Sequence, residues 1–162
     1  TSRGIAAAAG VNVAAINYYY RSKEALFEAA LISSLNHGLE HMLSFIDAEP
    51  WNPRQALREL GSFLLEGSLR HPVVTRKIFF DGKGNPRQQS GSALADIAKK
   101  ITGKFVKDSP RIDQERLLYR IGAFIMATIF PALIPDSQPW LETEEKRSAY
   151  IATLVEDFLV QG

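Results

Sequence analysis

Hydrophobic residues recur every three or four positions along most of this chain, which is the spacing of one face of an α-helix. The clearest stripe runs from Leu94 through Ile97 and Ile101 to Phe105. No segment shows the sustained alternation of hydrophobic and polar residues that is typical of a half-buried strand. The pattern therefore predicts an all-α fold.

Capping residues, glycines and prolines divide this pattern into separate helices. Gly10 ends a first short helix, and Asn52-Pro53 supplies a capping residue followed by proline at the first helical position. Pro50 and His71-Pro72 interrupt the periodicity. The predicted helices span about residues 1–9, 12–19, 22–49, 52–70, 74–79, 94–105, 113–134 and 143–160, and a loop rich in glycine and proline occupies 81–86.

Two short predicted helices meet at a tight, glycine-containing turn near the start of the chain, which is the signature of a helix-turn-helix. Alanines at residues 6–9 allow two steeply crossing helices to approach each other closely. Ile5, Val11 and Ile16 are expected to form the small core between them. The sequence thus predicts a nucleic-acid-binding module at this end.

The second of these helices has a nearly uncharged surface whose chemistry suits a DNA major groove. Asn17 can read an adenine edge, a small side chain such as Ala14 can contact a thymine methyl group, and tyrosines can reach phosphates. Arg21 and Lys23 flank it and can neutralise backbone charge. Residues 1–23 hold three basic residues and no acidic one, whereas residues 136–162 hold six acidic and two basic residues. A polyanion would therefore approach the N-terminal end.

Residues 1–26, TSRGIAAAAGVNVAAINYYYRSKEAL, resemble the DNA-binding signature of the tetracycline-repressor (TetR) family of transcriptional regulators. In that family an Ile-Ala…Ala-Gly-Val turn leads into a recognition helix, and Ser-Lys-Glu-x-Leu opens a long connecting helix. Asn17 and Tyr20 stand where many members carry tyrosine and phenylalanine, which marks an Ile-Asn-Tyr subtype with a base preference of its own. Family members have a further helix before this point, so we expect one upstream of Thr1 that is missing here.

The resemblance implies a helix-turn-helix DNA-binding domain over residues 1–25 and a helical ligand-binding and dimerisation domain over 26–162. The expected partners are double-stranded DNA with a palindromic operator, a second copy of the chain, and a small apolar or amphipathic effector that releases a repressor. No cofactor and no metal are expected. The residues expected to contact DNA are Thr1, Arg3, Asn12, Val13, Ala14, Asn17, Tyr18, Tyr19 and Lys23.

Aromatic residues are abundant between Trp51 and Phe130, in the part of the chain where the resemblance places an effector pocket. Aromatic residues at helical spacing also serve as ordinary core, and both interpretations stay open at this point. The candidate ligand contacts are Phe63, Phe79, Phe105 and Phe124.

The last two predicted helices are candidates for a dimer interface. Residues 121–134 are apolar around most of the helix circumference, so protein must bury them. Two such helices from each subunit would form a four-helix bundle with two-fold symmetry. Alternatively, they complete the core of the monomer. The residues expected at the interface are Leu117, Ile121, Ile125, Ile129, Ile151, Leu154, Val155 and Phe158.

The chain contains no cysteine, which excludes disulfides, thiolate metal sites and cysteine nucleophiles and fits a reducing cytoplasm. No segment resembles a signal peptide. The longest apolar stretch, residues 121–134, is shorter than the ~20 residues that cross a bilayer, so no membrane association is expected.

Two other functions compete with DNA binding. His37, Glu40 and His41 fit the H-x-x-E-H pattern of some zinc peptidases, which would make the chain a helical metal-dependent hydrolase. The chain could instead be a helical adaptor that does not bind DNA. No clear third metal ligand follows the two histidines, and neither alternative explains residues 1–26. The favoured interpretation is a DNA-binding regulator that is not an enzyme.

Overall fold

The computed structural model describes residues 1–47, 49–73, 75–76, 86–109, 111–134 and 139–160, and of these the side chains of 86–93 are left aside. All regular structure in this part of the chain is helical, which confirms the predicted all-α fold. The elements are α1 (Ser2–Ala9), α2 (Val13–Tyr20), α3 (Lys23–Asp47), α4 (Pro53–Arg70), α6 (Pro86–Asp108), α7 (Gln114–Leu133), the 3-10 turn η2 (Pro139–Leu141) and α8 (Glu144–Val160).

Most helix ends lie where capping residues predict them. The side-chain oxygen of Asn52 accepts the N–H of Gln55 at 3.0 Å and caps α4. The carboxylate of Asp113 caps α7 in the same way. The main difference is α6, which begins at Pro86, well before the predicted stripe, and η2 was not predicted. The helix expected over 74–79 lies largely outside the described residues.

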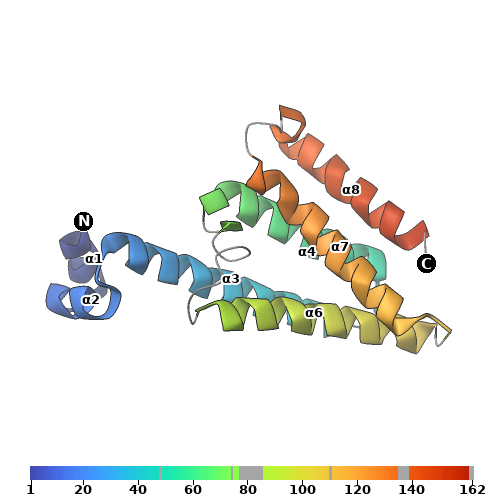
Figure 1. The fold of residues 1–162 in the computed structure, drawn as a ribbon, viewed down its shortest axis with the longest axis horizontal. Helices are drawn as coiled ribbons and strands as arrows, with labels where there is room; N and C mark the ends of the chain where they lie inside the picture. The colour runs from blue at the N-terminus through green and yellow to red at the C-terminus, as the bar shows by residue number, and fades with distance from the viewer. Residues whose placement is uncertain (48, 74, 77–85, 110, 135–138, 161–162) are drawn as a thin grey trace.

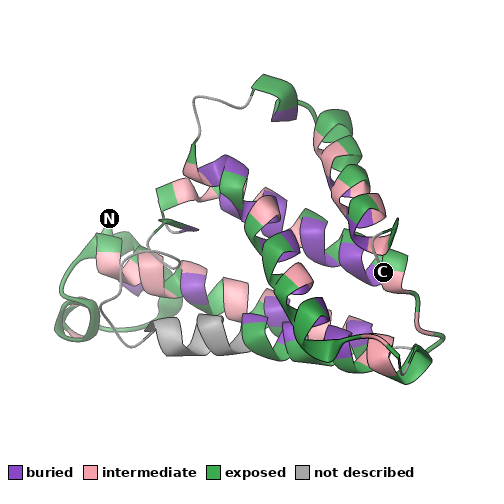
Figure 2. Ribbon diagram, turned by 45° about the vertical axis from the view of Figure 1, so that its right-hand side comes forward, coloured by how far each residue is buried: buried purple, intermediate pink, exposed green. Residues whose placement is uncertain are grey.

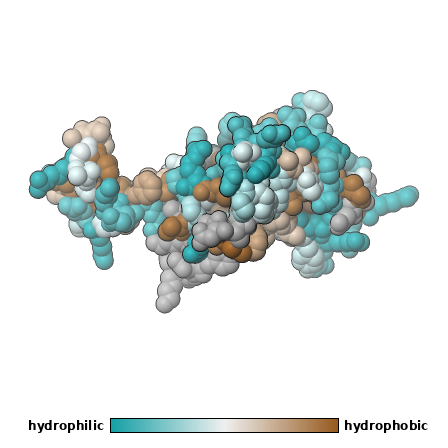
Figure 3. Space-filling view, turned by 90° about the horizontal axis from the view of Figure 1, so that it is seen from above, coloured by the Kyte–Doolittle hydropathy of each residue, from teal (hydrophilic) through white to brown (hydrophobic). Residues whose placement is uncertain are grey.

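The helices form a small head and a larger body. α1 and α2 make up the head at one end of the molecule, and the long helix α3 runs from the head through the body (Figure 1). Seen from above, the head is a knob joined to the body by a narrow neck (Figure 3). The expected domain boundary at residue 25 falls in the first turn of α3, so an unbroken helix links the two parts.

The body is a layered helical bundle with one continuous core. α6 lies along α3, while α4 packs against α7 and α8. The buried faces of these helices turn toward one another (Figure 2). Gly61 of α4 packs against both α7 and α8, because an added Cβ atom there would lie 3.1 Å from Phe124 of α7 and from Ile151 of α8. The fully buried core side chains include Leu39, Ile46, Leu57, Leu60, Leu65, Ile97, Ile101, Ile121, Ile129 and Val155.

The face of α7 and α8 that was expected to form a dimer interface is buried inside the chain itself. Only Leu154 among the eight expected residues is half-buried, and the other seven belong to the core. The hydrophobic periodicity of a helix identifies the face that must be buried, but it does not show whether the same chain or a second copy buries that face. The buried residues are Leu117, Ile121, Ile125, Ile129, Ile151, Val155 and Phe158.

A different face of α7 remains exposed and apolar. Tyr119, Met126 and Phe130 are 65%, 43% and 51% exposed, although each carries a large hydrophobic side chain. They follow one another at intervals of seven and four residues, so they share one side of the helix. This row, with Ala123 between Tyr119 and Met126, is called the α7 seam below.

α7 is longer than the apolar stretch read from the sequence because it begins at Gln114. By length and composition it is a helix that could cross a membrane. Core helices of soluble proteins pass the same test, and one face of α7 is packed into the bundle.

Candidate nucleic-acid interface and interior cavity

The head consists of two short helices that pack against each other. Ala6 of α1 and Ile16 of α2 are the buried residues of these helices. Between them Gly10 adopts a left-handed conformation with φ 66°, which glycine tolerates without strain. Ile5 and Val11, which were expected in the same core, are instead 40% and 49% exposed. Ile16 alone of the three predicted core residues is fully enclosed by the described chain.

Two residues expected at the DNA surface also cap helices. The Asn12 side-chain oxygen accepts the N–H of Ala14 at 2.8 Å, and the Thr1 hydroxyl oxygen accepts the N–H of Gly4 at 3.2 Å. Both side chains are therefore held at helix N-termini, where backbone N–H groups favour negative charge. Capping uses the oxygen of Asn12 and leaves its amide NH₂ group as a possible donor to a phosphate.

The outer face of α2 is open to solvent and uncharged. Tyr18 and Tyr19 are 80% and 75% exposed, and their rings meet edge to face with centroids 5.3 Å apart. Ala14 and Asn17 are also exposed, whereas Val13 is half-buried. The structure thus brings most of the predicted α2 contacts onto one accessible helix surface, with Val13 at its edge.

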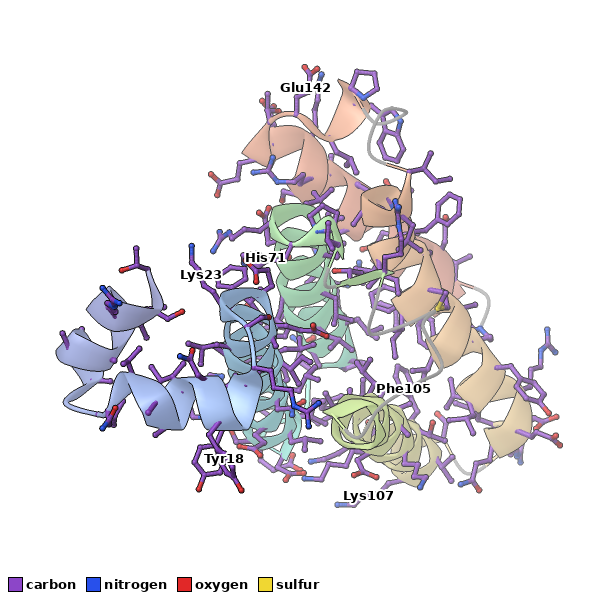
Figure 4. The ribbon with its side chains drawn as sticks, turned by 60° about the vertical axis from the view of Figure 1, so that its left-hand side comes forward. Tyr18, Lys23, His71, Phe105, Lys107 and Glu142 are labelled. Atoms are coloured by element: carbon purple, nitrogen blue, oxygen red, sulfur yellow. The ribbon has the colours of Figure 1, made fainter. Side chains whose placement is uncertain are left out.

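The head also carries three exposed basic side chains. Arg3, Arg21 and Lys23 are all exposed, and none forms an ion pair with an acidic residue in the described part of the chain. In Figure 4 the side chains of Tyr18 and Lys23 extend from opposite sides of the head. The head therefore combines an uncharged, exposed helix face with three positive charges that no carboxylate of the described chain neutralises.

The histidine pair on α3 has no metal-binding geometry. His37 Nδ1 lies 3.9 Å from Glu40 Oε2, and both side chains are strongly exposed. Within the residues that the structure describes, no group of three or more His, Asp or Glu side chains is close enough to hold a metal ion. The arrangement is that of a solvated helix face, with His41 also exposed.

The body contains a cavity of about 230 Å³ between the head-proximal part of α3 and the end of α4. Its surface is largely apolar, as is typical of sites for small organic molecules. Of the four predicted ligand contacts, Phe63 lines this cavity, Phe105 and Phe124 lie elsewhere, and Phe79 is outside the described residues. The lining residues are Leu31, Ser34, Leu35, Phe63, Leu64, Gly67, Ser68, Arg70, His71, Thr75, Leu94 and Ile129.

The polar groups of this cavity gather where α4 ends. The hydroxyl groups of Ser68 and Thr75 donate to the backbone carbonyls of Leu65 and His71, at 2.9 and 3.1 Å. Sequence patterns did not single out these residues, because a hydroxyl on a helix face carries no signal of its own. Only the breaking of α4 at His71-Pro72 hinted that the chain turns here.

His71 also connects the cavity to the neck of the molecule. Its ring meets the ring of Phe27 at a centroid distance of 6.4 Å in an edge-to-face arrangement. Phe27 lies on α3, one turn beyond Lys23, and is 58% exposed. The wall of the cavity is therefore in contact with the first turns of the helix that carries the head.

Comparison with known proteins identifies the head. Residues 1–30 match the family model described as bacterial regulatory proteins, tetR family. The match covers α1, α2 and the first turns of α3, which are the elements that form the uncharged face and its basic flanks. A comparison with curated proteins found no match to the chain.

Proposed function

The chain is a DNA-binding regulator with the N-terminal domain of the TetR family, and from this premise we propose that it is a dimeric repressor released from its operator by a small molecule. The observation that carries the proposal is the uncharged, exposed face of α2 on a head whose cations form no ion pair within the described chain. Such a regulator acts where the chromosome lies, so we place it in the cytoplasm.

In the proposed complex, some residues of the head would contact base edges and others would contact phosphates. Asn17 and Ala14 on the exposed side of α2 are suited to base edges, and Tyr18 and Tyr19 reach further outward. A major groove is about 12 Å wide and has phosphates along both borders. Exposed cations of the head, such as Lys23, would contact phosphates while α2 lies in the groove.

The dimer would use the α7 seam rather than the buried face of α7. Tyr119, Met126 and Phe130 are too exposed and too apolar to be explained by solvation alone. Beside the seam a shallow groove between α7 and α8 has Ala123, Ala127 and Leu154 in its walls. Small alanines let a partner helix approach closely, so α7 and α8 of two subunits could form a four-helix bundle. Two-fold symmetry would then require a palindromic operator.

The effector would occupy the cavity between α3 and α4. The lining is largely apolar, which suits a small apolar or amphipathic molecule, and its polar members are Ser34, Ser68, Arg70, His71 and Thr75. Leu31, Ser34 and Leu35 belong to α3, the helix that continues into the head. A ligand that fits the cavity better in one position of α3 would shift the population toward that position.

DNA binding can be tested by selecting duplexes from a random pool with the chain and measuring affinity against salt. Replacing Asn17 by alanine should change the selected sequence and cost about 1–3 kcal/mol at the base that it reads. Replacing Lys23 by glutamine should weaken binding to all sequences and lower the salt slope by about one. Lys99→Gln, on an exposed position of α6, is the charge-matched control and should change neither quantity. Wild-type binding by both head variants would contradict the proposed interface.

A further inference from the structure

The end of the body opposite the head contains a second cavity, of about 570 Å³. The C-terminal end of α6, the N-terminal end of α7 and the C-terminal end of α8 enclose it, far from α1 and α2 in Figure 1. It shares no lining residue with the cavity between α3 and α4. The two cavities are therefore separate sites.

Three arginines, Arg111, Arg116 and Arg120, border this distal cavity. Asp113 is the one carboxylate among its described lining residues, and its Oδ1 already accepts the backbone N–H groups of Glu115 and Arg116 at 3.0 and 3.1 Å. None of the three guanidinium groups forms an ion pair with a carboxylate of the described chain. The cavity thus carries an excess of positive charge.

Several other basic side chains of the body form ion pairs with acids from distant parts of the chain. Within the described chain, the three arginines of the distal cavity have no such partner. Isolated like charges near one another are unfavourable unless an anion joins them. The paired residues are Arg54 with Glu156, Arg147 with Glu66, Lys100 with Asp47 and Lys104 with Glu49.

Arg120 shows the effect of this excess positive charge most clearly. It donates to the backbone carbonyl of Phe158 and lies over the Phe158 ring, 4.7 Å from its centroid. Burial, and then the nearby charge of Arg116, lower the pKa of Arg120 below its usual value. A bound anion would relieve this repulsion. Arg120 is thus fixed in the wall, whereas Arg111 and Arg116 are exposed and free to turn toward a ligand.

Apart from the arginines, Ser109 and Asp113, the lining of the distal cavity is apolar. Phe105, Ile112, Leu117, Phe158 and Leu159 supply hydrocarbon surface beside the arginines. A ligand that matched both parts would need a negative head group and a short apolar tail. An inorganic anion would leave the apolar wall unused, and a neutral hydrocarbon would leave the guanidinium groups unpaired.

We propose that the distal cavity binds a small anionic amphiphile, with its carboxylate or phosphate head held by Arg111 and Arg116 and its tail against Phe105, Ile112 and Leu159. The planar guanidinium group forms paired hydrogen bonds with both kinds of head group. The proposal does not depend on DNA binding or on the effector cavity, because it concerns residues at the other end of the body.

Trp51 provides a reporter for binding. Its ring meets the Phe105 ring edge to face, with centroids 6.2 Å apart, so a ligand against Phe105 changes its surroundings. The chain contains two tryptophans, and the other, Trp140, packs against Tyr150 near η2. The variant Trp140→Phe therefore makes tryptophan fluorescence a signal from Trp51 alone.

The test titrates the Trp140→Phe chain, without DNA, with octanoate, octyl phosphate and the neutral control 1-octanol. A second protein adds Arg111→Gln and Arg116→Gln, which touch no residue of the effector cavity. The matched control adds Lys99→Gln and Lys107→Gln, which remove the same charge from exposed positions on α6. Figure 4 shows Lys107 on the side of α6 opposite Phe105.

We expect saturable changes in Trp51 fluorescence with octanoate, octyl phosphate or both, and the stronger binder identifies the head group. 1-Octanol should bind at least about tenfold more weakly, and the double arginine variant should lose at least about tenfold in affinity for the anion. The double lysine variant should bind like its parent. Equal binding of octanol and the anions, equal binding by the arginine variant, or no saturable signal would overturn the proposal.

Discussion

Gly38 of α3 faces the ring of Phe63 on α4 so closely that a Cβ atom built on Gly38 would lie 2.2 Å from the Phe63 ring. The absence of a side chain at residue 38 therefore sets how near the two helices come. Phe63 also lines the effector cavity, so this contact fixes one wall of the cavity relative to the helix that carries the head.

Replacing Gly38 by alanine should force the Phe63 ring or α3 to move. Overpacking of this kind costs about 1–3 kcal/mol, which outweighs the gain of up to about 1 kcal/mol from the better helix propensity of alanine. Gly103→Ala on α6 is the control, because a Cβ there meets nothing within 4 Å and should raise stability. Urea denaturation measures both. A Gly38→Ala protein as stable as the Gly103→Ala protein would show that the contact is loose.

Filling the effector cavity should block an apolar ligand. Gly67 lines the cavity, and a Cβ there meets nothing within 4 Å, so Gly67→Leu can place its side chain in the space without a clash at its root. The neutral dye N-phenyl-1-naphthylamine should then bind at least about tenfold more weakly. Gly103→Leu, on an open part of α6, should leave dye affinity unchanged. If the dye binds the Gly67→Leu protein as tightly as the wild type, its binding site lies elsewhere in the molecule.

The contact between Phe27 and His71 should transmit the state of the cavity to the head. A leucine at residue 67 acts as a permanent occupant, so we expect Gly67→Leu to lower operator affinity. Phe27→Ala should reduce that loss, and the double-mutant cycle should give a coupling energy of about 0.5–3 kcal/mol. Val160→Ala, at an exposed position of α8, should give none. Additive effects of Gly67→Leu and Phe27→Ala on operator affinity would rule out this route.

Local signals in the sequence predicted the helices and the head well. Gly10, Asn52 and Asp113 act on the backbone beside them, so their effect can be read without knowing the fold. The uncharged face of α2 was likewise found because its residues are contiguous. Each of these features depends on neighbours along the chain.

Features that depend on distant parts of the chain were not predicted. Phe63 and Phe105 look alike in the sequence, yet one lines the effector cavity and the other the distal cavity at the far end of the body. The three arginines of the distal cavity are unremarkable until the fold shows that none of them forms an ion pair with a carboxylate of the described chain. Ile5 and Val11 were expected in the core of the head because apolar character alone does not reveal whether anything covers a residue.

The dimer interface gives the sharpest test, because two adjacent residues of α7 are expected to respond in opposite ways. Ile125 is buried in the core of the chain, whereas Met126 belongs to the exposed α7 seam. Ile125→Glu would place an unpaired charge in the core, so the chain should unfold. Met126→Glu leaves its charge in water in the monomer, so it should keep the helical circular dichroism spectrum and lose only the dimer.

Sedimentation velocity at micromolar concentration measures the outcome. We expect wild-type dimers and folded Met126→Glu monomers that bind operator half-sites weakly, because two linked heads bind a palindrome far better than one. Ser33→Glu, at an exposed position of α3, is the control and should remain dimeric. A wild-type chain that sediments as a monomer would refute the dimer, and a dimeric Met126→Glu chain would move the interface away from the α7 seam.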